Sequence, residues 1–161
     1  QSKADFSNIT PMIVKMPSFE SFYIRNKGYN INIKETWQKL QTWILTNNIH
    51  SYKQIALFHD NPTITPLNDC QYIGCIVVDD LEKVESDRLP NFKIAEGVYA
   101  KFDLKGKTGD VLPFIHWVYH EWLPKSEYET TTKPSYAIYK KLDFLDDSDE
   151  FDLSFYVSIN F

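Results

Sequence analysis

Two groups of residues have the types and spacing of chemical sites. His116 and His120 lie four residues apart, so both imidazoles would share one side of a helix and could meet one metal ion. The zinc-protease signature has Glu directly after its first His, whereas this chain has Trp117, and no third ligand is evident. Residues 106–109 read GKTG but lack the upstream Gly of a phosphate-binding loop. We therefore expect an ordinary helical pair, a turn, and no bound metal.

Ser, Cys and His residues also occur without a nucleophile-elbow or protease signature. The sequence accordingly predicts no catalytic residues and no cofactor, and it favours binding over catalysis. A search for a helix-turn-helix likewise finds none, because the stretch before Trp37 is rich in Pro and β-branched residues and leaves no room for two successive helices.

Aromatic residues are the strongest candidates for a functional site. They make up 16% of the chain, with 4 Trp, 10 Tyr and 11 Phe, which is more than a core of this size requires. In the last apolar segment, Tyr156 stands between Ser154 and Ser158 on the polar face, which suits a concave surface that holds a ligand. A cationic ligand would be held by ring faces and a carboxylate. The candidate ligand-binding residues are Tyr29, Phe58, Phe114, Trp117, Glu129 and Tyr156, with Glu96 as a second acid.

Charge and composition narrow the class of protein. The chain has 161 residues, 43% of them hydrophobic and 24% charged, so it is long enough for a sizeable core. Its net charge of −5 and its pI near 5.3 argue against direct nucleic-acid binding. The acidic run at residues 143–152 is typical of a solvated loop. We expect no membrane segment and a cytoplasmic location, since Cys70 and Cys75 are placed on opposite faces of a strand and cannot pair.

The same order of elements is predicted in each half of the chain. In the first half, extended segments near residues 12–16 and 22–25 precede a helix that begins near Asn32. Its Ile33, Trp37, Leu40 and Ile44 recur at helical spacing. The strands predicted after it cover residues 54–60 and 71–79.

The second half repeats this pattern. A strand at residues 93–104 is followed by a helix from near Asp110 that is expected to end at Pro124. Strands at residues 134–142 and 152–161 complete the half. Landmarks such as Trp37 and Trp117 recur in order at offsets of roughly 73 to 80 residues. We therefore expect an α+β fold in which two duplicated β-α-β-β modules form a pseudo-two-fold antiparallel sheet with two main helices.

These modules are expected to pack as one domain over residues 1–161. The first half would cover residues 1–80 and the second residues 90–161, with a ligand groove where they meet.

Several segments resemble a known family, the gyrase-inhibitor-like (GyrI-like) effector-binding domain. The most specific is Glu-Trp-Leu-Pro-Lys-Ser-Glu-Tyr-Glu at residues 121–129, and the similarity spans essentially the whole chain. That domain occurs alone and at the C-terminus of AraC-type and MerR-type transcription regulators. The supporting segments are residues 57–62, 99–102, 134–139 and 155–159.

The resemblance implies a pseudo-symmetric pair of modules with a groove that binds small, often lipophilic or cationic molecules, as in multidrug-binding sensors. This sequence departs from the family pattern at Ala137, where family members usually carry Glu two residues before the Tyr, here Tyr139. That Glu would hold a ligand's positive charge, so its loss argues against a strong preference for cations. A milder departure is Ser158, which stands in place of a Pro.

The leading hypothesis is a non-enzymatic small-molecule-binding domain, either the sensor module of a bacterial transcription regulator or a free-standing binder. Any DNA-binding domain would then belong to the parent protein. One alternative is a hydrolase of a small lipophilic electrophile, as the resemblance implies for some stand-alone relatives, although these depend on the missing Glu. Another is a protein-inhibitory module of the gyrase-inhibitor type, in which the acidic run at residues 143–152 imitates DNA phosphates.

Overall fold

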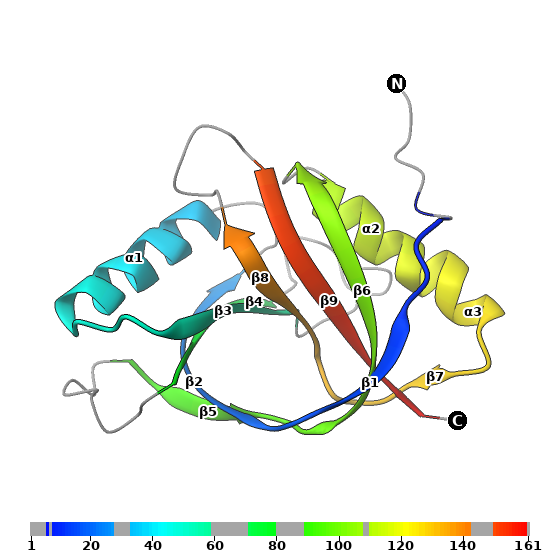
Figure 1. Ribbon diagram of the computed structural model, residues 1–161, viewed down its shortest axis with the longest axis horizontal. Helices are drawn as coiled ribbons and strands as arrows, with labels where there is room; N and C mark the ends of the chain where they lie inside the picture. Colours follow the sequence, from blue (N-terminus) through cyan, green and yellow to red (C-terminus); the bar gives the residue numbers. More distant parts are fainter. Residues whose placement is uncertain are drawn as a thin grey trace.

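The computed structural model describes residues 6, 8–27, 33–58, 71–79, 89–107, 110–142 and 150–160. Within them, one antiparallel sheet carries two main helices, which makes the fold α+β as expected (Figure 1). The helices are α1 (Ile33–Thr46), α2 (Val111–Trp117) and the short α3 (Leu123–Lys125). The strands are β1 (Met12–Met16), β2 (Phe19–Lys27), β3 (Tyr52–Phe58), β4 (Gln71–Val78), β5 (Asn91–Ile94), β6 (Gly97–Lys107), β7 (Glu129–Thr130), β8 (Ser135–Leu142) and β9 (Glu150–Asn160).

The strands follow the order β1-β6-β9-β8-β3-β4-β2-β5, and β7 pairs with β9. The centre of this order is the β8–β3 pair, where Ala137 lies opposite Ala56. The sheet is curled into a half-barrel, with β5 in the lower part of the view and β1 on the right side of the sheet in Figure 1. The chain therefore brings strands from its two halves together at the middle of the sheet.

Successive residues along the strands are buried on opposite faces of the sheet. On β9, Leu153, Phe155 and Val157 belong to the larger core cluster, which also contains residues of α1 and α2. Tyr156 lies between them in the sequence and belongs to a second cluster. Because successive strand residues point to opposite sides, this second cluster lies on the side away from the helices. We call the two sides the helix-covered face and the inner face.

Helix α1 packs closely on the helix-covered face. Its apolar stripe buries Trp37, Leu40 and Ile44, and the Trp37 indole N–H donates a 2.7 Å hydrogen bond to the Tyr72 hydroxyl on β4. A Cβ atom on Gly74 would come within 2.9 Å of the Leu40 side chain. The absence of a side chain at Gly74 thus lets the helix approach the sheet.

The second helical segment does not end where the sequence predicts. After α2, residues Val118–Trp122 form a π-helical turn, and α3 then carries the chain through Pro124 to Lys125. Proline has no N–H to donate, and just before it the Leu123 N–H bonds to the Val118 carbonyl, five residues earlier, as in a π-helical turn. Pro124 was expected to end the helix, and this expectation is wrong by one residue.

A single strand over residues 93–104 was also predicted wrongly. The structure divides this segment into β5, which pairs with β2, and β6, which pairs with β1 and β9. The break lies at residues 95–96, before Gly97, whose φ of 154° is rarely adopted by residues with a side chain. Gly97 therefore lies where the chain passes from β5, at one edge of the sheet, to β6, which is next to the opposite edge strand β1.

Candidate ligand-binding site

Three tyrosines form a connected aromatic surface on the inner face. The Tyr136 ring of β8 stacks on the Tyr156 ring of β9, with centroids 4.9 Å apart and an interplanar angle of 19°. The Tyr99 ring of β6 meets Tyr136 edge-on at 5.2 Å and Tyr156 at 6.4 Å. Burial raises the pKa of each of the three phenols, so all remain neutral at physiological pH.

A cavity of about 310 Å³ opens beside Tyr99 on this face. This volume is at the lower end of the range for small-molecule sites, and its walls are mainly aliphatic and aromatic. Five strands, β2 to β6, and the residues that precede β8 contribute to it. The lining residues are Tyr23, Arg25, Leu57, Ile73, Phe92, Lys93, Ile94, Ala95, Tyr99, Lys133 and Pro134.

The aromatic wall of the cavity is held by packing between strands. The Tyr23 ring of β2 meets the Phe92 ring of β5 edge-on, with centroids 4.8 Å apart. The hydroxyl of Tyr99 donates a 2.7 Å hydrogen bond to the carbonyl oxygen of Ala95. These contacts hold the rings in fixed positions around the cavity.

The charged residues that the structure describes in the cavity lining are all cationic. Arg25 follows Tyr23 by two residues on β2, so both side chains leave the strand on the same side. The Lys133 ammonium donates a 2.7 Å hydrogen bond to the carbonyl oxygen of Glu96. Lys93 also lines the cavity, but it lies between Phe92 and Ile94 on β5 and its side chain therefore leaves from the opposite side of the strand.

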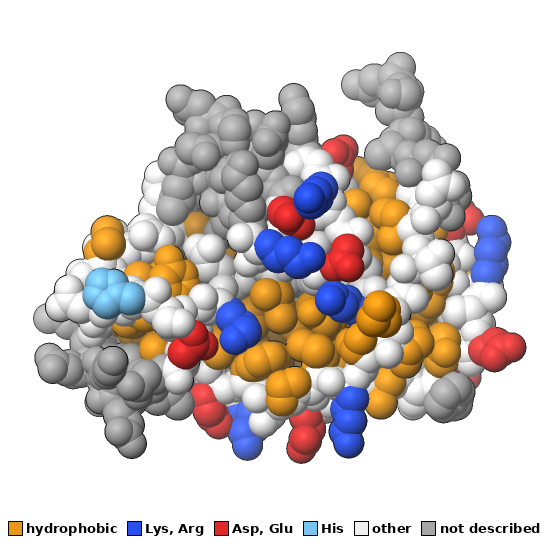
Figure 2. All heavy atoms as spheres, in the orientation of Figure 1, with side chains coloured by type: hydrophobic (Ala, Val, Ile, Leu, Met, Phe, Trp, Pro, Cys, Tyr) orange, Lys and Arg blue, Asp and Glu red, His pale blue; other side chains and the backbone are white. Residues whose placement is uncertain are grey.

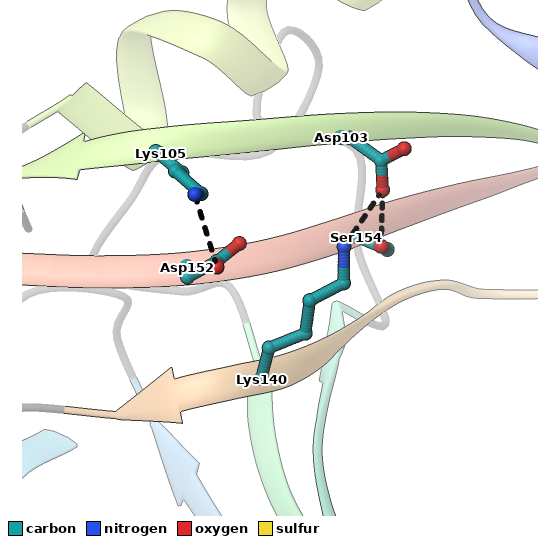
Figure 3. Close-up of polar contacts among 5 residues, drawn as sticks. All are labelled: Asp103, Lys105, Lys140, Asp152 and Ser154. Carbon is teal, nitrogen blue, oxygen red and sulfur yellow. Dashed lines mark hydrogen bonds and ion pairs between the residues drawn. The ribbon is translucent and has the colours of Figure 1, made fainter.

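At the other end of the inner face, basic groups are paired with acids (Figure 3). Asp103 accepts a 2.5 Å hydrogen bond from the Ser154 hydroxyl and lies 3.4 Å from the Lys140 ammonium. The Ser154 hydrogen bond is the main reason why the pKa of Asp103 is lowered, with Lys101 and Lys140 assisting. Lys105 pairs with Asp152 at 3.8 Å.

Figure 2 views the molecule in the same orientation as Figure 1, and hydrophobic side chains gather at the centre of this view. Acidic and basic side chains lie interspersed above them. The mixed signs agree with the ion pairs at that end of the sheet, where β6, β8 and β9 carry alternating charges.

The ring candidates predicted from the sequence do not come together at one site. Phe58 and Phe114 are almost fully buried on the helix-covered face, where each meets the Phe155 ring, at 5.9 and 5.8 Å. Trp117 stacks on Phe114 at 5.9 Å and is partly buried. Tyr156 lies on the inner face instead, and Tyr29 is outside the described residues.

The helix-covered face is filled by side chains of this chain. Phe6 packs edge-on against Phe114 at 5.2 Å and lies 6.1 Å from Trp117. Ala137, the position at which the family usually has Glu, is fully buried in the same cluster. Rings and small residues therefore occupy the space around Phe58, Phe114 and Ala137.

The two acids proposed as ligand contacts are exposed. Glu129 lies on β7, whose partner is the end of β9, and Glu96 lies between β5 and β6. Neither carboxylate belongs to the lining of the 310 Å³ cavity. Only the backbone of Glu96 contributes there, through the carbonyl group that accepts from Lys133.

Sequence reasoning missed most of the cavity lining. Arg25, Phe92 and Lys133 come from segments far apart in the chain, and only the pairing of β2 with β5 and the position of β8 brings them together. One available signal was the alternation of Tyr23 and Arg25 along β2. It shows that both residues share a face but does not reveal which face is hollow.

Two other depressions offer less to a ligand. One has a volume of about 480 Å³, and the described residues that line it all lie within residues 117–126, on one helical segment. The other has a volume of about 110 Å³ and lies between β9 and the residues that precede β8. Compared with these two depressions, the cavity on the inner face has apolar walls on several sides and a volume suited to a small molecule.

The described residues contain no group of three His, Cys, Asp or Glu side chains that could hold a metal ion. His116 and His120 do lie together, with ring centroids 4.8 Å apart on the helical segment. Among the described helices, none combines the length and the apolar character needed to cross a membrane.

Comparison with family models matches residues 9–159 to the GyrI-like small molecule binding domain. The chain belongs to the GyrI-like family. The match extends over almost the whole sequence and includes both main helices and all nine described strands except the last residue of β9. The resemblance inferred from residues 121–129 is thereby confirmed. Comparison of this sequence with curated proteins finds no match.

Solved structures share the GyrI-like fold at low sequence identity. The C-terminal domain of EcmrR aligns with a TM-score of 0.69 and 15% identity over 95% of this chain and 98% of that one. EcmrR in a complex with DNA aligns with a TM-score of 0.71 and 14% identity, over 94% of this chain and 57% of that one. A hydrolase from Listeria innocua has a TM-score of 0.65 and 11% identity, over 94% and 92% of the two chains. SAV2435 bound to tetraphenylphosphonium has a TM-score of 0.59 and 9% identity, over 93% of each.

Proposed function

We propose that this GyrI-like domain binds a small lipophilic molecule in the cavity on the inner face of its sheet. The observation that carries the proposal is the cavity itself, which has a volume of about 310 Å³ and apolar walls from β2 to β6. A ligand that leaves water for such walls gains free energy in proportion to the apolar area it buries. The fixed rings of Tyr23, Phe92 and Tyr99 lower the cost of ordering the site.

A sensor role in transcription regulation is the use we propose for this binding. The fold is shared with the C-terminal domain of EcmrR, a protein solved on DNA. A domain of this kind would transmit ligand binding to a DNA-binding domain elsewhere in the parent protein, or would act as a free-standing binder. The net charge of −5 supports the proposal that this chain does not itself contact DNA.

We also propose that the fold is an internal duplication within one domain, with halves at residues 1–80 and 90–161. Support comes from the strand order, in which corresponding strands lie at equal distances on the two sides of the central β8–β3 pair. On one side β8 is followed by β9, β6 and β1, and on the other β3 is followed by β4, β2 and β5. In the sequence, each main helix also follows the second strand of its half, α1 after β2 and α2 after β6.

Binding is favoured over hydrolysis by the chemistry of the lining. Activation of a water molecule requires a general base within hydrogen-bond reach, and no Asp, Glu or His among the described residues lines this cavity. The hydrolase alternative therefore has no described carboxylate or imidazole in the cavity lining to act as that base. The acidic run behind the protein-inhibitor alternative falls mainly on residues 143–149, which lie outside the described residues.

The test is a titration with N-phenyl-1-naphthylamine, a neutral lipophile whose fluorescence rises in apolar surroundings. We expect saturable binding to the wild-type protein. Ile73→Trp places a larger side chain in the cavity wall and should weaken binding at least about tenfold, which is about 1.4 kcal/mol. Leu57→Phe is a milder second variant for the same wall. Both residues are buried and belong to the cavity lining.

The matched control is Leu45→Trp, which adds the same ring at an exposed position of α1. This variant should bind the dye as the wild type does. Melting temperatures and near-ultraviolet circular dichroism establish that each variant is folded before its affinity is compared. Equal affinities in the wild type, Ile73→Trp and Leu57→Phe would place the ligand outside this cavity and contradict the proposal.

A further inference from the structure

The cationic rim of the inner-face cavity carries a further inference about the ligand. We infer that the cavity selects a lipophilic anion, a molecule whose apolar body lies against Tyr23, Phe92 and Tyr99 and whose carboxylate, sulfonate or similar acid group is held by Arg25 and Lys133. This inference rests on the proposed function, because it names the class of ligand that the same cavity takes.

The described charges that line the cavity are positive. Arg25 and Lys133 line the cavity, and no acidic residue among the described ones does so. A cation in this cavity would approach two like charges with no carboxylate to offset them, whereas an anion would approach two opposite charges. The lining therefore discriminates by charge as well as by apolar contact.

The side chains of Arg25 and Lys133 are available to bind an acid group. Five other basic residues each form an ion pair with an acid, namely Lys39, Lys53, Lys105, Lys125 and Lys140. Within the part of the chain that the structure describes, neither Arg25 nor Lys133 pairs with an acidic side chain. The hydrogen bond from Lys133 goes to the backbone carbonyl of Glu96, which carries no net charge. Among the described residues, no acidic side chain would compete with an incoming acid group for either cation.

The ammonium group of Lys133 is held in a defined position beside Gly97. The Lys133 ammonium lies only 2.7 Å from the place where a Cβ atom on Gly97 would stand. Gly97 thus leaves room for the ammonium group against the start of β6, and the Glu96 carbonyl orients it. The guanidinium of Arg25 adds planar paired N–H donors that suit carboxylate and sulfonate oxygens.

The experiment compares two probes that share one ring system. N-phenyl-1-naphthylamine is neutral, and 8-anilino-1-naphthalenesulfonate carries an added sulfonate on the same rings. We expect Arg25→Gln and Lys133→Gln each to weaken binding of the sulfonate about fivefold, the effect of one partly exposed charge contact. The neutral probe should change less than about twofold in the same variants, since the apolar walls are intact.

The control variant is Lys39→Gln, which changes the net charge by the same amount on the exposed side of α1. It should leave the affinity for both probes unchanged, so a drop seen here as well would reflect overall charge and overturn the inference. Raising the salt concentration should weaken the sulfonate more than the neutral probe. Arg25 and Lys133 are exposed, so the glutamine variants are expected to fold.

The possible outcomes separate this inference from the proposed function. If the neutral probe binds but the sulfonate does not, or if the two glutamine variants leave sulfonate binding unchanged, the anion preference is wrong and the binding function stands. Equal losses for both probes in a glutamine variant would mean that the side chain supports the cavity structurally, which also overturns the inference. If neither probe binds the wild-type protein, the proposed function fails and the inference fails with it.

Discussion

Tyr136 has a buried hydroxyl group for which the described residues provide no hydrogen-bond partner. Its ring stacks on Tyr156 and contacts Tyr99, so the residue is held by its apolar body rather than by its polar tip. Burial without a partner disfavours ionisation and raises the pKa of this phenol. The hydroxyl therefore lowers the stability of the fold while the ring raises it.

We expect Tyr136→Phe to retain the free energy of unfolding of the wild type or to exceed it by about 1 kcal/mol, because it removes a desolvated polar group and keeps the ring. Tyr99→Phe is the matched control. The Tyr99 hydroxyl donates to the Ala95 carbonyl at 2.7 Å, so its removal should cost about 1 kcal/mol. Urea unfolding measures both. A clear loss of stability in Tyr136→Phe, as large as that in Tyr99→Phe, would show that the Tyr136 hydroxyl is paired in solution.

At the scale of elements, the packing of α1 on β4 depends on Gly74. A Cβ atom there would lie 2.9 Å from Leu40 Cδ1 and 3.0 Å from Thr36 Cγ2. Leu40 is fully buried, so its side chain has little room to move away.

We therefore expect Gly74→Ala to lower the free energy of unfolding by about 1–2 kcal/mol through overpacking. The double variant with Leu40→Ala provides the check, because the smaller side chain makes room for the new methyl group. In the Gly74→Ala background, Leu40→Ala should cost less than in the wild type by at least about 0.5 kcal/mol. Strictly additive losses in thermal or urea unfolding would contradict this contact.

The elements also show what sequence patterns can and cannot predict. The alternation of Leu153, Phe155 and Val157 with Ser154 and Tyr156 predicted a strand, and the structure confirms one with two buried faces. The break at residues 95–96 was missed, because apolar residues continue on both sides of it and only the pairing partners change.

The candidate site was harder to predict than the fold. Phe58, Phe114 and Trp117 were selected for being aromatic, but aromatic residues also fill cores, and these three pack on the helix-covered face. The lining of the inner-face cavity depends on long-range strand pairing that no local pattern reveals. Tyr156 was expected on a concave polar face, and it lies on the inner face together with Tyr99, which does line the cavity.

At the scale of the whole molecule, buried tyrosines link stability to alkaline pH. The chain has 10 Tyr, and burial raises the pKa of Tyr139 to about 12 and that of Tyr72 well above its usual value. In the unfolded chain these phenols ionise near pH 10. Because their folded-state pKa values are raised, their contribution to stability is fully present below about pH 10 and is lost as the pH rises toward 12.

We expect the free energy of unfolding to fall steeply between about pH 10 and 12. Tyrosinate absorbance should show several tyrosines that ionise only when the protein unfolds. Tyr72→Phe removes one buried phenol, and the free energy of unfolding should then depend less steeply on pH over this range. If all tyrosines titrated near pH 10 while the circular dichroism remained native, the buried positions of these rings would be contradicted.

The central claim is that a small molecule binds on the inner face, in the cavity beside Tyr23, Phe92 and Tyr99. The most direct measurement is a crystal structure of the full chain with bound N-phenyl-1-naphthylamine. The account predicts electron density for the naphthyl ring among these three side chains. Density on the helix-covered face instead, between α1 and α2 and beside Ala137, would contradict it.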